Sequence, residues 1–577
     1  MQKEMVKRLF FRDFFDFCGN EPQNEAFRIS WRSRIFRLGI VFAGGLAYAA
    51  ALPPLNLSVL GMFTLVPLLC YACQENWKHA MLGGFVWCMG WALPAYWFLR
   101  EIEVFVPFIV AVVESLWIML YAVLVSLLWK YTMFPQKVNA DGWIARRTFL
   151  AEGGSVGRMF LFALGSAALF TLNEWSRSRI FPWNGLEITQ WRNTPLIQLA
   201  AVTGSYGVAF LVAFFNTSAF CTVVTRFKGG GRIVLLSAMG AWALCVVGGY
   251  IWSVGEVMRP NWFPVLIQGD LTQRRIPKPG QAEEAIGIYA SLTEQALKKY
   301  PDGDVIIWPE SAVPLLYRSS YHLSQIYRSE VIRLARNGKI PLLIGAIDFD
   351  DSAVGEPGIT NSALLIGTDG RIRRKYDKIH RVPWGEYIPG RQFLPQALIE
   401  AIDMGRDLVP GTDFTPIDMG KNVRAGTAIC FEGVFGYVTR NFALHGANVL
   451  VVISNDAWYP RSSEPEQHLA NAVMRAVETG LPMVRCGNNG GSLVVTPNGR
   501  ITQVLEVPGA EKRLELRRGR GFRQVAVRVI EQPRKTVYVR FGEWFIGVLG
   551  IVALAWVLFG ISEFRKNRLS LLKKAEV

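Results

Sequence analysis

The sequence predicts a polytopic α-helical membrane protein that carries one large polar α/β domain. Its composition is the first reason: the chain has 577 residues, is 51% hydrophobic and has a mean hydropathy of +0.23, which is high for a water-soluble enzyme. The second reason is the distribution of apolar residues. Apolar segments near the ~20 residues needed to cross a bilayer core fill the first half and recur near the C-terminus. Between them, residues 256–540 are more polar.

About eight apolar segments are expected to be transmembrane helices. The first begins near Leu38 and the last covers roughly residues 544–562. The other six cover roughly residues 56–73, 80–99, 104–128, 158–175, 195–225 and 233–252. An even number of spans places both ends of the chain on the same side of the membrane.

The distribution of basic residues predicts the orientation. The formal charge is +16, and Lys and Arg are concentrated in links and termini that fall on one face of the eight-span arrangement, which the positive-inside rule makes cytoplasmic. The predicted parts are a cytoplasmic arm (1–37), a seven-helix transmembrane domain (38–255), an α/β domain outside the cytoplasm (256–540), and a final helix with a basic cytoplasmic tail (541–577). No zinc-finger or RNA-binding signature accompanies the charge, so nucleic acid is not expected as a partner.

The polar region contains an acid, a lysine and a cysteine, each directly after or near an apolar run. Glu310 follows Val305-Ile-Ile-Trp-Pro, Lys378 follows Tyr376-Asp, and Cys430 follows Gly426-Thr-Ala-Ile. A cysteine attacks as its thiolate, and a free thiol with a pKa of about 8.5 needs a neighbouring base at neutral pH. We expect Glu310 to take that proton. Lys378 and a backbone N–H such as that of Phe431 would then stabilise a tetrahedral oxyanion.

Other reactive side chains are expected to be structural. Eight cysteines, mostly in or beside apolar spans, do not form a disulfide framework, and Cys70-Tyr-Ala-Cys73 lacks the second ligand pair of a zinc site. Cys486 is expected inside a strand core, His380 in a polar loop contact, and His468, which begins a helix-like stretch, on the surface. No metal or cofactor is predicted.

Several motifs together resemble a known family. In the polar region they are Trp308-Pro-Glu310, Lys378 with Glu386-Tyr387, Cys430-Phe-Glu432 and Asn455-Asp-Ala-Trp458. In the apolar half they are Asn173-Glu-Trp175, Phe181-Pro-Trp183 and Thr203-Gly-Ser-Tyr-Gly-Val-Ala-Phe-Leu211. The set, in this order, resembles the nitrilase superfamily and more closely its membrane-embedded branch, the apolipoprotein N-acyltransferases.

The resemblance implies a nitrilase-like α-β-β-α sandwich and assigns roles to particular residues. The implied catalytic triad is Glu310, Lys378 and Cys430. Supporting roles are implied for Glu386, Glu432 and Phe431. Substrate contacts are implied for Trp458, Tyr387 and Asn455, with Trp458 on a loop near the path by which lipid reaches the site.

The resemblance also implies an activity and a setting. A phospholipid would donate an acyl chain to Cys430 as a thioester, and the amine of a diacylglyceryl-cysteine at a lipoprotein N-terminus would attack it in a ping-pong cycle. The partners would be phospholipid, diacylated apolipoproteins and membrane lipid, for a monomer in the bacterial inner membrane whose α/β domain faces the periplasm. Two alternatives remain open. A membrane-tethered nitrilase-type amidase would hydrolyse small soluble amides without lipid, and a non-catalytic lipid-binding protein would tolerate replacement of Cys430.

Overall fold

The computed structural model divides the chain into two compact units, Met1–Trp252 with Glu543–Val577, and Ser253–Gly542. The structure describes residues 31–133, 155–253, 259–273, 278–351, 358–396, 399, 407–459, 462–507, 512–513 and 516–558. The predicted orientation depends partly on charges that lie outside the described residues. These charges are in the arm up to residue 30, the basic link at 134–154 and the tail from residue 559.

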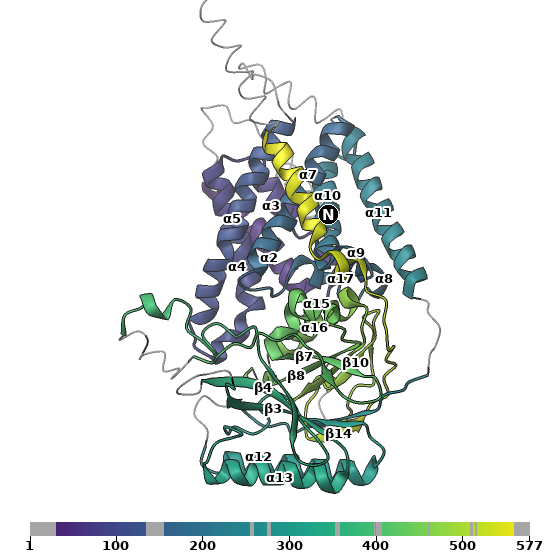
Figure 1. Cartoon of the computed structure of the whole chain (residues 1–577). Helices are drawn as coiled ribbons and strands as arrows, with labels where there is room; N and C mark the ends of the chain where they lie inside the picture. The colour runs from purple at the N-terminus through teal and green to yellow at the C-terminus, as the bar shows by residue number, and fades with distance from the viewer. Residues whose placement is uncertain are drawn as a thin grey trace, which may run out of the picture. The chain divides into compact units, whose positions relative to one another are not determined.

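The first unit is a bundle of helices (Figure 1). Its long helices are α2 (Trp31–Ala51), α4 (Trp77–Ala95), α5 (Val106–Met133), α7 (Val156–Ser178), α10 (Ser205–Val224) and α11 (Gly229–Ser253). Shorter helical segments connect them: η1 (Ser58–Met62), α3 (Val66–Ala72), η2 (Trp97–Glu101), η3 (Leu186–Gln190), α8 (Thr194–Ile197) and α9 (Ala200–Thr203). α4 packs against α2 and α5, and α7 packs against α5 and α10.

Five described helices are long and apolar enough to cross a membrane: Ser33–Ala51, Val106–Met133, Val156–Ser178, Ser205–Val224 and Gly229–Ser253. Of three shorter apolar helical segments, Ser58–Ala72 and Trp544–Leu558 fall where further spans are expected, and Thr194–Thr203 falls in the same expected span as Ser205–Val224. The segment expected at 195–225 is divided, because α10 begins only after Gly204, whose φ of +71° belongs to the left-handed region that favours glycine. The five helices support the expected membrane character, and the count of about eight stays a prediction.

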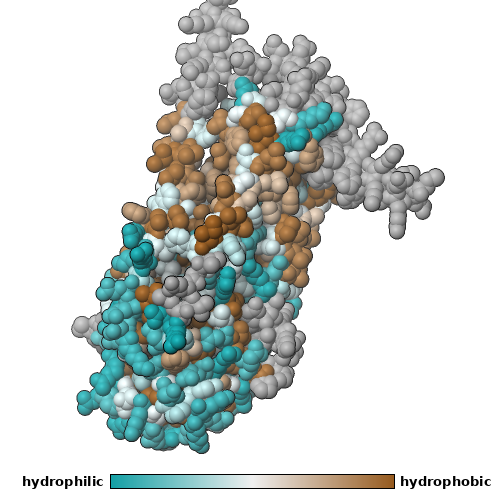
Figure 2. All heavy atoms as spheres, turned by 90° about the vertical axis from the view of Figure 1, so that its right-hand side faces the viewer, coloured by the Kyte–Doolittle hydropathy of each residue, from teal (hydrophilic) through white to brown (hydrophobic). Residues whose placement is uncertain are grey.

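Apolar side chains cover much of the outside of the helical unit. On α11 they include Leu244, Val247, Ile251 and Trp252, all exposed. The hydrophobic colouring of the helical unit, against the mainly hydrophilic colouring of the α/β unit, is visible in Figure 2. Such a surface is unfavourable in water and suits contact with lipid chains.

The interior of the helical unit also holds charges. The Arg177 guanidinium lies 3.3 Å from Glu114 and 3.1 Å from Glu174, and it donates to the Trp183 carbonyl oxygen. All three charged side chains are buried. Because a buried charge without a partner is costly, removing one member of this cluster leaves the others uncompensated. The cluster therefore joins α5, α7 and the segment after α7.

The second unit is built from two six-stranded sheets. In spatial order the first contains β14 (Gly521–Gln524), β1 (Pro264–Gln268), β2 (Val305–Ile307), β3 (Leu342–Phe349), β4 (Ile359–Ile366) and β5 (Ile372–Asp377). The second contains β11 (Ile501–Thr502), β10 (Leu493–Val495), β9 (Met483–Gly487), β8 (Val449–Ser454), β7 (Arg424–Ile429) and β6 (Ile417–Asp418). A separate hairpin pairs β12 (Lys512–Arg513) with β13 (Leu516–Arg517). In each sheet the central pairs are parallel and the outer pairs antiparallel.

Helices cover the outer face of each sheet (Figure 1). α12 (Gln281–Lys299) and α13 (His322–Gly338) pack on the first sheet, where Tyr289 and Tyr327 join a core with Trp308. α15 (Gly436–Leu444) packs against β7, and α16 (Glu464–Thr479) packs against η5 (Cys430–Val434). The other helical segments among the described residues of this unit are η4 (Arg391–Phe393), η6 (Asp456–Trp458) and α17 (Val537–Phe541). This arrangement confirms the predicted α-β-β-α sandwich.

Candidate active site

The candidate catalytic residues follow the ends of strands from both sheets. Glu310 lies three residues after β2, Lys378 directly follows β5, and Cys430 directly follows β7. A close backbone approach positions Glu310: a Cβ at Gly345 of β3 would lie 2.4 Å from the Pro309 carbonyl oxygen and 2.5 Å from the Glu310 Cα. Only glycine fits there without moving the Glu310 backbone.

Lys378 contacts two carboxylates. Its Nζ lies 3.0 Å from Glu386 Oε1 and 3.4 Å from Glu310 Oε1, and the residue is only 2% exposed. Burial alone would lower the pKa of Lys378, but Glu386 and then Glu310 hold it above its usual value. The side chain is therefore an ammonium ion, a compact positive charge held beside two carboxylates.

Asn361, on β4, holds the same two carboxylates together and was not among the residues expected from the sequence. Its Nδ2 donates to Glu310 Oε1 at 2.8 Å and to Glu386 Oε1 at 2.9 Å. Asn455 completes the contacts of Glu310, because its backbone N–H donates to Glu310 Oε2 at 3.1 Å and its Nδ2 donates to the Glu310 carbonyl at 3.3 Å. Glu310 is thus oriented by an ammonium and two amide side chains.

Cys430 begins η5 in an unusual backbone conformation. Its φ is +53°, in the left-handed region that non-glycine residues rarely adopt, and such strain costs ~1–3 kcal/mol. Burial raises the pKa of the Cys430 thiol well above its ordinary value; Glu310 raises it further, while Lys378 opposes the shift. The Ser454 hydroxyl lies 3.7 Å from the sulfur. The resting side chain is therefore a thiol that needs a base at the moment of attack.

Glu432 ties the Cys430 turn to the end of β5. Its carboxylate accepts hydrogen bonds from the backbone N–H groups of Ile429 (2.8 Å), Ile379 (2.7 Å) and His380 (2.9 Å), and from the Tyr376 hydroxyl (2.9 Å). Burial raises the pKa of Glu432 to about 7, although these hydrogen bonds and Lys378 act against the shift. The residue is fully buried, so its contacts position Cys430 and Lys378 relative to each other.

The residues expected to contact substrate lie in different environments. Trp458 on η6 is 48% exposed, and Tyr387 is half-buried with the Arg381 guanidinium 4.3 Å from its ring centroid. Neither is among the described hydrogen-bond partners of Glu310, Lys378 or Cys430. The expected contacts of these two residues with substrate therefore stay predictions.

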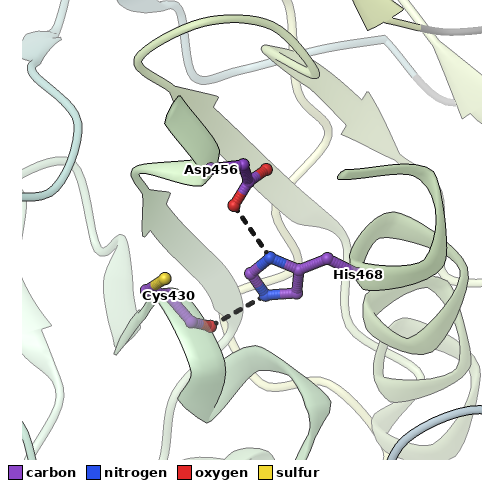
Figure 3. Close-up of side chains that lie close together, drawn as sticks. All are labelled: Cys430, Asp456 and His468. Carbon is purple, nitrogen blue, oxygen red and sulfur yellow. Dashed lines mark hydrogen bonds and ion pairs between the residues drawn. The ribbon is translucent and has the colours of Figure 1, made fainter. Parts of the chain in front are cut away.

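His468 is not on the surface, and the expectation from the sequence was wrong. It is 1% exposed on α16, because neighbouring parts of the α/β unit, η5 among them, cover this helix. Its Nε2 lies 3.0 Å from the Cys430 carbonyl oxygen and its Nδ1 3.0 Å from Asp456 Oδ1, as Figure 3 shows. Asp456 also accepts a hydrogen bond from Ser454 at 2.6 Å and pairs with Arg485.

The ligand atoms of Cys430, Asp456 and His468 lie within 4.8 Å of one another, close enough to be tested as a metal site. Both Asp456 oxygens already have partners, one of them the Arg485 guanidinium, whose charge opposes a cation. In Figure 3 the contacts of His468 run to the Asp456 carboxylate and to the Cys430 carbonyl oxygen, not to the sulfur. The arrangement suits a hydrogen-bond network better than metal coordination.

Cys486 was expected in a strand core and His380 in a polar loop contact. Cys486 is buried in β9 with its sulfur 3.4 and 3.3 Å from the carbonyl oxygens of Ile267 and Ile307, which confirms a strand-core thiol, and burial raises its pKa to about 12. His380 Nδ1 lies 2.8 Å from the Tyr437 hydroxyl. Burial and then the Lys378 charge lower the pKa of His380 to about 4.

Known protein families match both the apolar and the polar region of the chain. Residues 267–508 match the carbon-nitrogen hydrolase family, and residues 44–218 match the apolipoprotein N-acyltransferase N-terminal domain. An apolipoprotein N-acyltransferase of Geobacter metallireducens is 32% identical over 473 residues, which cover 79% of this chain and 84% of that protein. The chain belongs to the apolipoprotein N-acyltransferase family. It is therefore an acyltransferase, as the resemblance implies, and homologues with this name support lipoprotein N-acylation.

Other members of the family are similarly related. The apolipoprotein N-acyltransferase of Brucella melitensis is 31% identical over 433 residues, covering 72% of this chain and 75% of that protein. Among solved structures, a carbon-nitrogen hydrolase from Helicobacter pylori is 21% identical, covers 42% of this chain and 83% of that chain, and superposes with a TM-score of 0.30.

Proposed function

We propose that this acyltransferase moves an acyl chain from a phospholipid to the N-terminal amine of diacylated apolipoproteins through a thioester on Cys430. The observation that carries the proposal is the contact between one buried ammonium, Lys378, and the carboxylate of Glu310, beside a strained cysteine. Nucleophile, base and cation within one site are what acyl transfer through a covalent intermediate requires.

In the first half-reaction, the Cys430 sulfur attacks the ester carbonyl of the phospholipid as Glu310 accepts the thiol proton. The raised pKa of the thiol makes this transfer necessary, because little thiolate exists beforehand. The carbonyl π electrons become an oxyanion, which Lys378 and the Phe431 N–H stabilise. Collapse of the oxyanion forms the thioester and breaks the bond to the lysophospholipid oxygen, which receives the proton from Glu310.

In the second half-reaction, the free amine of the diacylglyceryl-cysteine attacks the thioester. The new C–N bond forms, the C–S bond breaks, and the proton lost by the amine passes through Glu310 to the departing sulfur. Glu386 acts through Lys378, which it contacts at 3.0 Å, and Glu432 acts through the backbone that it holds. Neither residue needs to contact substrate.

The substrate contacts are proposed from position. Trp458 is an exposed indole on the segment that follows β8, which suits a contact with a lipid chain on its way to Cys430. Tyr387 lies one residue from Glu386 and is proposed to contact the same substrate. The bonds from Asn455 to Glu310 favour orientation of the base over direct contact with substrate.

We further propose the setting predicted from the charges: about eight spans, both termini in the cytoplasm, and residues 256–540 facing the periplasm of an inner-membrane monomer. Both substrates are anchored in the bilayer, so a membrane-bound enzyme meets them in two dimensions and extracts neither into water. A periplasm-only reporter fused at Gly355 should be active, and one fused after Lys574 inactive. The opposite pattern would place the chemistry in the cytoplasm.

The deciding experiment is incubation of the purified protein with a phospholipid and a diacylated lipopeptide, followed by mass spectrometry. Without acceptor, the protein should gain the mass of one acyl chain, and hydroxylamine should release it because thioesters are labile to that reagent. Adding the lipopeptide should discharge the enzyme and acylate the peptide amine, whereas a peptide with a blocked amine should not react.

Two variants make the experiment specific. Cys430→Ala should never gain the acyl mass, and Glu310→Gln should fail to load because it cannot accept the thiol proton. Full-rate transfer to the peptide without any adduct on Cys430 would replace the ping-pong cycle by direct transfer. Release of free fatty acid without acyl gain on the peptide would instead indicate a membrane-tethered hydrolase.

A further inference from the structure

The peptide bond between Cys430 and Phe431 carries two groups that matter for acyl transfer. Its carbonyl belongs to the nucleophilic residue, and its N–H is the proposed oxyanion donor. A peptide unit is planar and trans, so the carbonyl and the N–H point in opposite directions and turn together. Whatever holds the Cys430 carbonyl therefore also sets the direction of the Phe431 N–H.

That carbonyl faces His468. The Nε2 atom lies 3.0 Å from the Cys430 oxygen, and because a carbonyl only accepts hydrogen bonds, Nε2 carries the proton and donates it. Figure 3 shows the contact of the ring running to the carbonyl oxygen and not to the sulfur. The contact joins α16 to η5 across 38 residues of sequence.

The imidazole is itself held in place. Asp456 Oδ1 lies 3.0 Å from Nδ1, which fixes the orientation of the ring. Asp456 is anchored in turn by the Ser454 hydroxyl at 2.6 Å and by Arg485, which is fully buried. Burial alone would raise the pKa of Asp456, but Arg485 and then His468 hold it below its usual range, so it stays ionised. The result is a chain of buried contacts that ends at the Cys430 carbonyl.

The strained backbone of Cys430 explains why its carbonyl needs the contact with His468. Cys430 has a φ of +53°, and a residue in that region relaxes toward other conformations unless its surroundings hold it. Glu432 accepts the N–H of Ile429, which precedes Cys430, whereas His468 holds the carbonyl that follows the Cys430 Cα. Without the second contact the peptide after Cys430 is held less firmly.

We propose that His468 is a positioning residue for acyl transfer: by donating to the Cys430 carbonyl, it fixes the peptide whose Phe431 N–H faces the developing oxyanion. The proposal rests on the proposed role of Cys430 as nucleophile. His468 neither gains nor loses a proton in the cycle. The S–C bond forms, the carbonyl electrons move to oxygen, and the thiol proton goes to Glu310 as described above.

The test compares two reactions of the same sulfur in the full-length protein. Acylation of Cys430 by phospholipid passes through an oxyanion. Alkylation of Cys430 by iodoacetamide displaces iodide at a saturated carbon and forms none. Both rates are followed by mass spectrometry of the peptide that contains Cys430, for wild type, His468→Asn, His468→Gln and the surface control His322→Asn.

Loss of one oxyanion donor lowers rates by ~10²–10³-fold. We expect His468→Asn, whose amide is too short to reach the carbonyl, to lower the acylation rate ~10²-fold and the alkylation rate less than about threefold. The longer amide of His468→Gln should recover part of the acylation rate, and His322→Asn, on the exposed start of α13, should leave both rates unchanged. Should His468→Asn not accumulate, His468→Gln against wild type decides: a loss of acylation that exceeds the loss of alkylation supports the proposal, and parallel losses overturn it.

Other outcomes overturn the proposal. A parallel fall of acylation and alkylation would mean that His468 only maintains the shape of the site, and unchanged rates in both would mean that the contact has no role. Failure of the proposed function looks different: Cys430→Ala would still acylate the lipopeptide, whatever His468 variants do.

Discussion

Replacement of Lys378 by arginine separates its charge from its shape. Lys378 Nζ contacts Glu386 at 3.0 Å and Glu310 at 3.4 Å in a site where the residue is 2% exposed. Arginine keeps the positive charge but carries a larger planar group that cannot place a compact ammonium at the oxyanion. The variant therefore tests whether acyl transfer needs the position of the charge or only its presence.

Two magnitudes follow from these contacts. Loss of one oxyanion donor costs ~10²–10³ in kcat, equivalent to about 2.7–4 kcal/mol of transition-state stabilisation. Removing the charge altogether, as in Lys378→Met, leaves Glu310 and Glu386 without their shared cation and should destabilise the fold by ~3–5 kcal/mol. Lys378→Arg keeps a cation beside both carboxylates, so its stability loss should be smaller than that of Lys378→Met while its kcat falls by the full ~10²-fold or more.

The assay is the acylation rate of a diacylated lipopeptide at saturating phospholipid, with thermal unfolding measured on the same preparations. Lys375→Arg is the matched control, because Lys375 lies on β5, the strand that Lys378 directly follows, is also largely buried and pairs with Asp377 at 3.1 Å. It should change the rate less than about threefold. A kcat near wild type for Lys378→Arg would show that Lys378 is only a structural cation, and a loss that merely tracks unfolding would lead to the same conclusion.

Three further outcomes are expected. Thiol counting on the unreduced, denatured protein should find all eight cysteines free, although the α/β domain is proposed to face an oxidising compartment; finding six would remove the thiol mechanism for the isolated form. The pKa of His380 is lowered to about 4 in the folded protein, so as the pH falls the unfolded chain protonates this residue first. The contribution of His380 to stability is therefore present above pH 6.5 and is lost as the pH falls through about 4. His380→Gln should flatten that part of the pH–Tm profile and His322→Gln should not; equal profiles would refute the assignment. Tyr376→Phe removes a 2.9 Å donor to Glu432 and should destabilise the protein by ~1.5–3 kcal/mol in thermal or denaturant unfolding, and an unchanged midpoint would contradict this.

The parts of the site that could be predicted lie where an apolar run ends on a reactive residue. Glu310, Lys378 and Cys430 all follow strands, and strand ends bring distant residues to the same edge of a sheet. The pattern of apolar and polar residues is local, so it is legible in one sequence. The α/β character of the polar region was predictable for the same reason, and the family resemblance implied the α-β-β-α sandwich.

Asn361 shows what such patterns miss. It lies within β4, in a run that reads as strand interior, and nothing beside it in the sequence points to a site. Its partners Glu310 and Glu386 are 51 and 25 residues away. Only the pairing of β4 with β3 and β5 brings the amide between those carboxylates, and strand pairing is a property of the fold.

The apolar half shows a different limit. Hydropathy alone merges residues 195–225 into one segment, whereas the chain forms two short helices and then starts α10 after Gly204. Hydropathy measures the average apolar character of a segment and does not report where its backbone turns. A single glycine with positive φ, between Thr203 and Ser205 in a longer apolar stretch, leaves the average almost unchanged, so hydropathy averaging does not show the break.

The conformation of Cys430 depends both on a residue close in the sequence and on a residue that only the fold brings near. The strained residue is held on one side by Glu432, two positions further along, and on the other by His468, on a different helix. Glu432 belongs to the Cys430-Phe-Glu432 motif, and the family resemblance implied a supporting role for it. The second contact requires α16 to be packed against η5. A histidine near the start of an amphipathic helix is ordinarily exposed, and here it is buried because η5 and other parts of the α/β unit cover α16, while each ring nitrogen has a polar neighbour at 3.0 Å. The candidate nucleophile can therefore be found from its neighbours in the sequence, whereas His468, one of the two groups that hold its backbone, is found only from its neighbours in space.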